Sequence, residues 1–256
     1  MKLIVLGSGT SVPHAQRASS AYWLATSGGS LVLDIGPDAA HRMAQEGLDW
    51  ANLDAIWISH FHLDHLGGLA PFLFGTKWAP QTQERTKLLR IFGPTGIENL
   101  LHAFDQPNNY RLFNQSFVIK VIEIEGGSKV EVLPGVAAQT FATPHTRESL
   151  AIRLTDKDGA SLVYTSDTGP SEALAAFAQS ADLLLIECSF RRAKPIQNHL
   201  QLTEAMDIVR RAAPKKAVLT HLYPEWDNID LAAEAKALWS GKTVAAADGL
   251  VLEIRG

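Results

Sequence analysis

Three of the nine histidines in this chain lie within one stretch of seven residues, 59–65. The stretch holds four side chains of the kinds that bind metal ions: His60, His62, Asp64 and His65. It follows an apolar run that we expect to be a strand, so the first two histidines alternate onto one side of an extended segment. Buried polar groups need partners, and a divalent metal ion supplies one. The alternative is a solvated polar turn, which has no need of three imidazoles.

Three further side chains of the same kinds each stand directly after an expected strand: His145, Asp167 and His221. Loops at strand ends are held by a rigid scaffold and often carry functional residues. Each of these residues alone is more often an ordinary loop residue. Their common placement favours one shared site, which we predict to bind metal.

The elements that must position these residues are short. We expect strands at 3–6, 21–25, 31–35, 55–58, 182–186 and 217–219. Consecutive strands with glycine-containing turns fill 116–164, and a last strand pair, 243–246 with 250–254, closes the chain. Helices are expected after Pro37, from 64 towards 78, from near 94, and at 171–180, 203–213 and 231–239. No linker or repeat divides the chain, which predicts one α/β domain over 1–256, with packed sheets inside and helices outside.

Composition narrows the possible functions. The chain of 256 residues is 46% hydrophobic and 20% charged, as in ordinary globular proteins. A net charge of −4 argues against a protein that coats nucleic acid, but permits a small phosphorylated substrate. The single cysteine, Cys188, excludes an internal disulfide and a cysteine-rich zinc knuckle. The apolar amino-terminal run is too short for a signal segment, and no run could span a bilayer, so we expect a cytoplasmic protein without membrane partners.

The pattern His-x-His-x-Asp-His, followed by isolated His, Asp and His at strand ends, resembles the metallo-β-lactamase superfamily over the whole chain. The resemblance implies a four-layer αββα sandwich with two divalent metal ions, usually zinc. It also implies two ligand sets bridged by Asp167: His60, His62 and His145 for one ion, and Asp64, His65 and His221 for the other. Imidazole and carboxylate ligands without thiolate suit zinc, but also manganese or iron.

Within the superfamily, the opening Leu-Gly-Ser-Gly-Thr at 6–10 and the strand end at Glu187 resemble the ribonuclease Z-like branch. In that branch a glutamate orients a histidine that helps phosphodiester cleavage, which implies these roles for Glu187 and His199. The alternative for His199 is an exposed histidine preceding a helix. Proteins of this branch often dimerise, so the resemblance extends the expectation of a homodimer to this chain.

Enzymes that process tRNA 3′ ends resemble this sequence but insert a long tRNA-gripping arm between the positions of His145 and Asp167. This chain has room there only for a hairpin centred on 158–159. The negative net charge also disfavours tRNA, because tRNA binding depends on phosphate neutralisation. The similar phosphoribosyl cyclic phosphodiesterases carry a cysteine-rich zinc site that Cys188 alone cannot build.

We therefore predict a dinuclear-metal-dependent hydrolase, a phosphodiesterase acting on a small phosphodiester, cyclic phosphate or nucleotide. The metals lower the pKa of a water towards about 7 for zinc. Asp64 aims this water, and His199, held by Glu187, stabilises charge or protonates the leaving oxygen. Expected substrate contacts, each with an ordinary surface or packing role as its alternative, are Arg191, Arg192 and Tyr223.

Three other functions stay open on the same pattern. The first is hydrolysis of a lactone, thioester or β-lactam, because fold does not fix function. The second is a ribonuclease Z-type RNA 3′ endonuclease. The third is a non-enzymatic binding or scaffold protein, which would tolerate lost ligands, although none is missing here.

Overall fold

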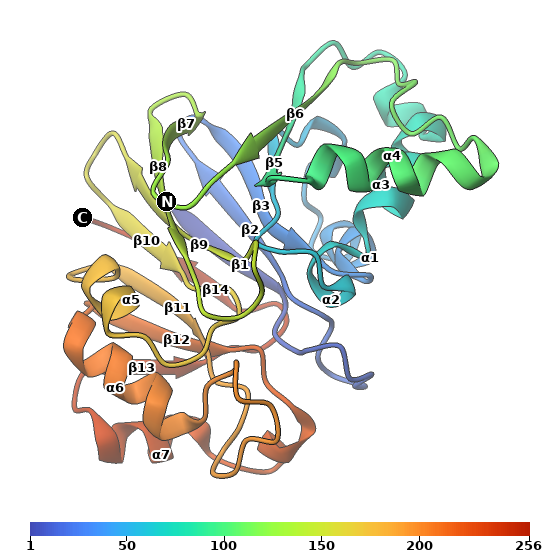
Figure 1. Cartoon of the computed structure of the whole chain (residues 1–256). Coiled ribbons are helices and arrows are strands. Elements are labelled where there is room, and N and C mark those ends of the chain that lie inside the picture. Colours follow the sequence, from blue (N-terminus) through green and yellow to red (C-terminus); the bar gives the residue numbers. More distant parts are fainter.

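The computed structural model describes residues 1–256 as two seven-stranded sheets that face each other (Figure 1). The first sheet has the order β14-β1-β2-β3-β4-β5-β6. Its strands are β1 (Lys2–Gly7), β2 (Ala21–Thr26), β3 (Gly29–Ile35), β4 (Ala55–Trp57), β5 (Leu89–Pro94), β6 (Ile119–Ile124) and β14 (Val251–Glu253). The second sheet runs β13-β12-β11-β10-β9-β8-β7. Its strands are β7 (Lys129–Leu133), β8 (Val136–Ala142), β9 (Leu150–Asp156), β10 (Ser161–Tyr164), β11 (Leu183–Glu187), β12 (Lys216–Thr220) and β13 (Lys242–Ala245).

Helices cover the outer face of each sheet (Figure 1). Those of the first half are α1 (Ala39–Gln45), α2 (Leu63–Leu66), α3 (Leu69–Trp78) and α4 (Ile97–Asp105), with short 3₁₀ turns η1 (Trp50–Asn52), η2 (Pro80–Thr82) and η3 (Gln106–Asn108). The second half has α5 (Glu172–Phe177), α6 (Leu202–Ala212), α7 (Leu231–Leu238) and the turn η4 (Pro224–Trp226). The prediction of a four-layer αββα sandwich is confirmed. None of the helices has the length and apolar character that crossing a bilayer requires.

Both faces of the central strands are buried, and the sequence of β1 shows how. Leu3 and Val5 face the core between the two sheets, whereas Ile4 and Leu6 face the core under the helices. Successive side chains of a strand point to opposite faces, so a strand covered on both sides is apolar throughout. The same principle explains the apolar runs that the sequence analysis identified as strands.

The last two strands do not pair with each other, so the predicted closing strand pair is wrong. β13 lies parallel to β12 in the second sheet, and β14 lies antiparallel to β1 in the first. Each strand extends one edge of a different sheet and satisfies backbone groups that would otherwise stay unpaired there. The turn at Gly249, where φ is +85°, lies between them.

The predicted helix from 64 to 78 is interrupted, and β5 was not predicted as a strand. α2 and α3 are separated at Gly67 and Gly68. The Gly68 amide donates to the carbonyl of Ile35 (2.9 Å), and a Cβ on Gly68 would lie 2.3 Å from the carbonyl oxygen of Gly36. Only glycine permits this close approach, which anchors the one-turn helix α2 against the end of β3. The helix expected near Pro94 begins at Ile97, because Pro94 still belongs to β5.

Two glycine substitutions test this anchoring. Gly68→Ala forces the backbone away from Gly36 and is expected to lower the free energy of unfolding by about 1–3 kcal/mol. Gly75→Ala, in the exposed part of α3 with no atom near the new methyl group, is the matched control. It is expected to raise stability by about 0.5–1 kcal/mol through helix propensity. Urea unfolding of both variants measures the difference, and equal effects would contradict the close-approach argument.

Candidate metal centre

Loops after four strands meet at one edge of the sandwich and bring all seven predicted ligand side chains together. The loops follow β4, β8, β10 and β12. Ligand atoms that lie within 4.8 Å of one another form two main groups: His60, His62, His145 and Asp167 in the first, and Asp64, His65 and His221 in the second. The sequence therefore identified the residues that converge, although they come from both sheets.

Asp167 stands between the two groups and turns one oxygen to each. Its Oδ1 lies 3.3 Å from Nε2 of His65 and 3.4 Å from Nε2 of His221. Its Oδ2 lies 3.6 Å from Nε2 of His145 and 3.7 Å from Nε2 of His60. A carboxylate placed in this way can turn one oxygen to each of two cations.

Within each group the other donor atoms also point at one another. Nδ1 of His62 lies 3.1 Å from Nε2 of His145. In the second group, Oδ2 of Asp64 lies 3.3 Å from Nε2 of His221 and 3.7 Å from Nε2 of His65. Each group thus offers several nitrogen or oxygen atoms around one position.

Three buried side-chain atoms of the kinds that bind metal have no hydrogen-bond partner at the centre. They are Nε2 of His60, Nε2 of His65 and Oδ1 of Asp167. Buried polar atoms in folded proteins are almost always satisfied, so these three need a partner. Divalent cations at the two positions would satisfy all of them. Imidazole and carboxylate donors without a thiolate fit zinc, manganese or iron, so the residues present fit two such ions.

Electrostatics keeps some of these groups, but not His65, in the protonation states that bind metal. Burial lowers the pKa of His65, but the charges of Asp167 and Asp34 outweigh it and raise that pKa well above its usual value, so His65 must lose a proton to bind an ion. Burial alone would raise the pKa of Asp167, but the charges of His221 and His65 outweigh it and hold that pKa well below its usual range. Burial, reinforced by the charge of His65, lowers the pKa of His60 well below its usual value. An ionised carboxylate and a neutral imidazole are the ligating forms.

Asp34 orients His65 of the second group through the ring nitrogen that does not face the centre. Its Oδ2 accepts hydrogen bonds from Nδ1 of His65 and from the Tyr164 hydroxyl, each at 2.6 Å. Its Oδ1 accepts the amide of Ser59 at 2.7 Å. With Nδ1 of His65 engaged as a donor, its Nε2 is left free to face the centre. The sequence analysis gave Asp34 no role, although an aspartate inside an apolar strand was the available signal.

Three residues at the centre adopt left-handed backbone conformations: Asp34, Ser166 and His221, with φ of 55°, 53° and 57°. For a residue with a Cβ this conformation costs on the order of 1–2 kcal/mol. Ser166 and His221 follow the ends of β10 and β12, whereas Asp34 lies within β3 at the register shift between β2 and β3. Such strain persists where surrounding contacts over-determine the backbone, as they do here.

Glu187 accepts hydrogen bonds from four residues beside the metal positions and is almost fully buried. Its Oε1 accepts from Nδ1 of His199 (3.1 Å) and from the amide of Thr168 (2.6 Å). Its Oε2 accepts the amide of Leu200 (3.0 Å) and the hydroxyl of Ser189 (2.5 Å). Burial lowers the pKa of His199, but the hydrogen bond and the charge of Glu187 more than offset it, so that the net pKa is raised.

Ser189 connects Glu187 to the second group of candidate ligands. Its role was not predicted from the sequence. Its hydroxyl donates to Glu187 and lies 2.9 Å from Nδ1 of His221. Because the single hydroxyl proton goes to the carboxylate, the oxygen accepts from Nδ1–H of His221. That bond sets the His221 tautomer and leaves Nε2 for Asp64, Asp167 and an ion.

Of the three residues expected to contact substrate, Tyr223 lies beside the centre. Its ring centroid is 6.1 Å from that of His221, and it stacks on Phe190 at 4.6 Å. The Arg191 guanidinium is ion-paired with Glu234 of α7 instead. Arg192 is exposed and forms no ion pair or hydrogen bond. For Arg191 the structure thus shows a protein partner, Glu234, that was invisible in the local sequence.

A four-layer sandwich with these histidines and aspartates at one edge defines a metal-dependent hydrolase of the metallo-β-lactamase fold. The family model of the anti-Pycsar protein Apyc1 matches residues 1–242, so the chain belongs to the Apyc1 family. Uncharacterized protein ML1173 of Mycobacterium leprae is 31% identical over 100% of this chain and 89% of its own length. Ribonuclease Z of Archaeoglobus fulgidus is 24% identical over 99% of this chain and 97% of its own.

Solved structures give the same fold. The metallo-β-lactamase fold protein YhfI from Bacillus subtilis superposes with a TM-score of 0.82 at 26% identity, over 98% of this chain and 99% of that one. The short form of human tRNase Z superposes with a TM-score of 0.81 at 20% identity, over 100% of both chains. The sequence-based resemblance to the superfamily and its ribonuclease Z-like branch is confirmed.

Substitution of Ser189 tests its link to His221. Ser189→Ala removes the acceptor of Nδ1–H and is expected to weaken metal binding at the second position about 10–100-fold, whereas Ser189→Thr retains it. Competition with a chelator, together with metal content by emission spectrometry, measures the change. Ser27→Ala, in an exposed turn, is the control. Unchanged affinity in Ser189→Ala would show that His221 is oriented without it.

Proposed function

We propose that this protein is a phosphodiesterase that hydrolyses a small phosphodiester or cyclic phosphate, such as a cyclic nucleotide, with two divalent metal ions. The observation that carries the proposal is the placement of the Glu187–His199 pair. The His199 ring lies 4.7 Å from that of His145 and 5.3 Å from that of His221. A protonatable imidazole beside two metal positions suits departure of an alkoxide from phosphorus, which ordinarily needs a proton.

The donor geometry supports the following ligand assignment, with zinc as the proposed metal and manganese or iron as alternatives. One ion would be held by His60, His62 and His145, the other by Asp64, His65 and His221, and Asp167 would be shared. When bound, two divalent ions supply Lewis-acid charge to a phosphoryl group and lower the pKa of an attacking water.

The protein's own residues orient the reactants and move the proton. Asp64 turns Oδ2 to the second ion position, and we assign its remaining lone pairs to a hydrogen bond that aims the attacking water. Glu187 holds Nδ1 of His199, so that Nε2 presents its proton to the leaving oxygen. The raised pKa of His199 enlarges its protonated fraction at neutral pH. Tyr223 forms an aromatic wall on which a base can stack.

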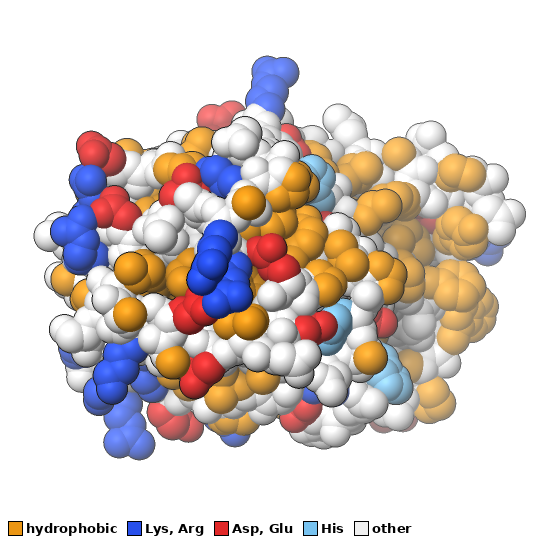
Figure 2. Space-filling view, turned by 90° about the horizontal axis from the view of Figure 1, so that it is seen from below, with side chains coloured by type: hydrophobic (Ala, Val, Ile, Leu, Met, Phe, Trp, Pro, Cys, Tyr) orange, Lys and Arg blue, Asp and Glu red, His pale blue; other side chains and the backbone are white.

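Three observations favour a small substrate over tRNA. Between His145 and Asp167 the chain forms only β9, β10 and their connecting turn, with no arm. The net charge is −4, and on the face drawn in Figure 2 basic side chains are interspersed with acidic and apolar ones rather than joined in a stripe.

Membership of the Apyc1 family supports an anti-Pycsar role for this hydrolysis. The related ribonuclease Z of Archaeoglobus fulgidus, by its name, supports cleavage of a phosphodiester.

The test compares two phosphodiesters that differ in leaving group with a panel of lactones and thioesters, using zinc- and manganese-loaded protein. We expect chelator-sensitive turnover of bis(p-nitrophenyl) phosphate and of a 3′,5′-cyclic nucleotide. His199→Ala is expected to slow the cyclic nucleotide about 10²–10⁴-fold. The loss should be smaller for p-nitrophenolate, which leaves as a stable anion without a proton.

The control for this experiment is His41→Ala, which removes an exposed histidine of α1. Turnover confined to the lactones or thioesters would keep the metal centre but overturn the phosphodiesterase proposal. Equal losses on both phosphodiesters in His199→Ala would reject His199 as proton donor.

The pH dependence gives a second test of His199. A general acid must be protonated, so kcat/KM for the cyclic nucleotide should fall as the pH rises through the pKa of His199. Because that pKa is raised, the fall should lie on the alkaline side of the ordinary histidine range. His199→Ala should lack this limb, and its persistence in the variant would assign the limb to another group.

A further inference from the structure

The segment that carries His199 joins β11 to α6 as a loop that is closed at its neck. The amide of Phe190 donates to the carbonyl of Leu200 (3.1 Å), and the amide of Leu202 donates to the carbonyl of Phe190 (2.8 Å). We call residues 191–199 the His199 loop. No helix or strand forms within it, and its tip is exposed. Loops with few buried contacts open locally at a low free-energy cost, so the position of His199 needs a further restraint.

Lys194 supplies that restraint from inside the loop. Its Nζ donates to the carbonyl oxygens of His199 (3.2 Å) and Gln197 (3.3 Å) and pairs with Oε1 of Glu204 (2.8 Å) in α6. Only 11% of its side chain is exposed. A lysine is seldom buried to this extent unless its charge is paired. The three N–H donors of the ammonium all have acceptors in the protein, so none is left for a phosphate.

Glu204 ties this contact to the start of α6. Its Oε2 accepts the amide of Gln201 at 3.0 Å, so one carboxylate joins the first turn of the helix to Lys194. The apolar side of α6 packs in the core under the second sheet. The His199 loop is therefore anchored to a rigid element by a single charged side chain.

Asn198 stands between the two carbonyls that Lys194 holds and contacts His145. Its main-chain carbonyl accepts Nδ1–H of His145 (2.8 Å), and its side-chain amide donates to the carbonyl of His145 (2.9 Å). Apart from contacts among the candidate ligands, the ring has no other hydrogen-bond partner. The Nδ1 atoms of His65 and His221 have side-chain partners instead. The orientation of His145 therefore depends on the path of the main chain through the His199 loop.

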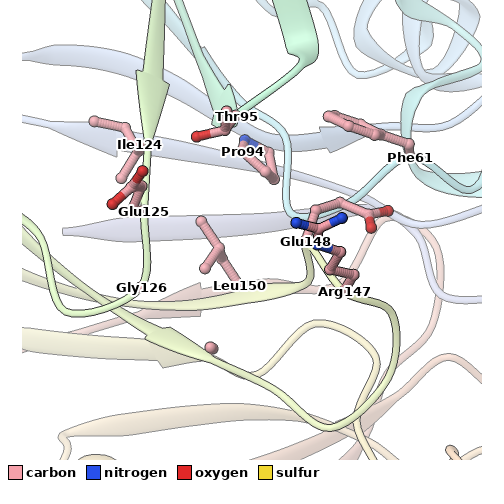
Figure 3. A pocket seen from close by; sticks show the side chains of 10 residues that line it. Phe61, Pro94, Thr95, Ile124, Glu125, Gly126, Arg147, Glu148 and Leu150 are labelled. Carbon is pink, nitrogen blue, oxygen red and sulfur yellow. The ribbon is translucent and has the colours of Figure 1, made fainter.

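The loop that carries His145 borders a hollow rather than packed protein over part of its length. Arg147 and Glu148, which follow His145 closely, line this hollow of about 440 Å³ (Figure 3). Arg147 is exposed and Glu148 is partly exposed. A segment that is loosely packed on one side is oriented by the contacts that it does have, and for the ring of His145 that contact is the Asn198 carbonyl.

We propose that Lys194 is a positioning residue that couples the proton donor to the first ion position, that of the ligand group containing His145. By holding the carbonyls on either side of Asn198, one ammonium sets both the acceptor of His145 and the place of the His199 ring. The two rings lie 4.7 Å apart, so a shift of the loop moves one relative to the other. The role of His199 rests on the proposed phosphodiesterase function, whereas the effect on His145 stands without it.

Kinetics with metal in excess test the position of His199. Lys194→Met removes the charge and nearly keeps the length of the side chain. It is expected to lower kcat for a 3′,5′-cyclic nucleotide about 10–100-fold and to leave KM within about threefold, because a displacement of about 1 Å can cost on the order of 10²-fold in rate. Lys194→Arg keeps a charged donor and should recover most of the rate.

The control is Lys215→Met, which removes an exposed lysine that pairs with Asp182 before β12 and should leave kcat unchanged. A raised KM with unchanged kcat in Lys194→Met would make Lys194 a phosphate contact and overturn the proposal. Equal losses in Lys194→Met and Lys215→Met would also overturn it, because the effect would then be a general one of losing an ion pair.

Chelator competition tests the effect on His145 without any turnover. Lys194→Met is expected to bind one of the two ions about tenfold more weakly, at the lower end of what loss of a ligand's outer partner costs. Because Ser189→Ala acts on the other ion, the double variant Ser189→Ala/Lys194→Met should show both losses. Metal content by emission spectrometry follows each release. A double variant that keeps one ion as tightly as the wild type would reject the assignment of Lys194 to the first position.

Glu204→Gln tests the same link in a second way, should Lys194→Met not fold. It keeps an oxygen that can accept the amide of Gln201 and removes the charge that pairs with Lys194. It should lower kcat and weaken the first ion, and wild-type behaviour of this variant would overturn the proposal.

The two proposals fail in different ways. If metal-loaded protein hydrolyses no phosphodiester but Lys194→Met releases one ion early, the phosphodiesterase proposal fails and the positioning of His145 stands. If phosphodiesters are hydrolysed and Lys194→Met matches the wild type in kcat and in metal binding, the positioning role is wrong and the phosphodiesterase proposal stands.

Discussion

One buried carboxylate between two sets of imidazoles is the constraint on which the rest of the site depends. Asp167 turns each of its oxygens to a different group, at distances of 3.3–3.7 Å. A charge in such a dry position is tolerable only among opposite charges and hydrogen-bond donors. The histidines must therefore come close to it, and the loops that carry them must end at the same edge of the sandwich.

The surrounding structure meets that demand with two further buried carboxylates. Asp34 approaches from the first sheet and fixes His65, whereas Glu187 approaches from the second and fixes His199 directly and His221 through Ser189. Each is saturated with hydrogen bonds from backbone and side chains, so that the imidazoles are held in defined tautomers. The imidazoles of the centre are thus oriented by hydrogen bonds from both sheets.

The sequence predicted the layers and the residues that converge at one edge, because both depend on local patterns. Apolar runs bounded by glycine identify strands buried on both faces, and ligand-type residues after those strands identify the edge. Other features depended on distant partners. Ser189 matters only because Glu187 and His221 lie on either side of its hydroxyl, and the ion-pair partner of Arg191, Glu234, lies on a distant helix. β13 and β14 likewise join different sheets, because each pairs with a strand whose edge would otherwise be unpaired. The sequence of neither short strand shows which partner it will have.

The origin of the ligands has a consequence for how the chain folds. The donors extend from His60 to His221, and both sheets contain parallel pairs, such as β3 with β4 and β11 with β12, that join distant segments. Sheets with such pairs fold slowly, because the chain loses entropy in closing the long loop before the stabilising contacts between the strands can form. The metal positions arise only once both sheets are docked, so the chain must reach its native state while Nε2 of His60 and Nε2 of His65 are still unsatisfied. Metal then binds the native state far better than the unfolded chain, and by mass action it stabilises the protein most where ions are plentiful.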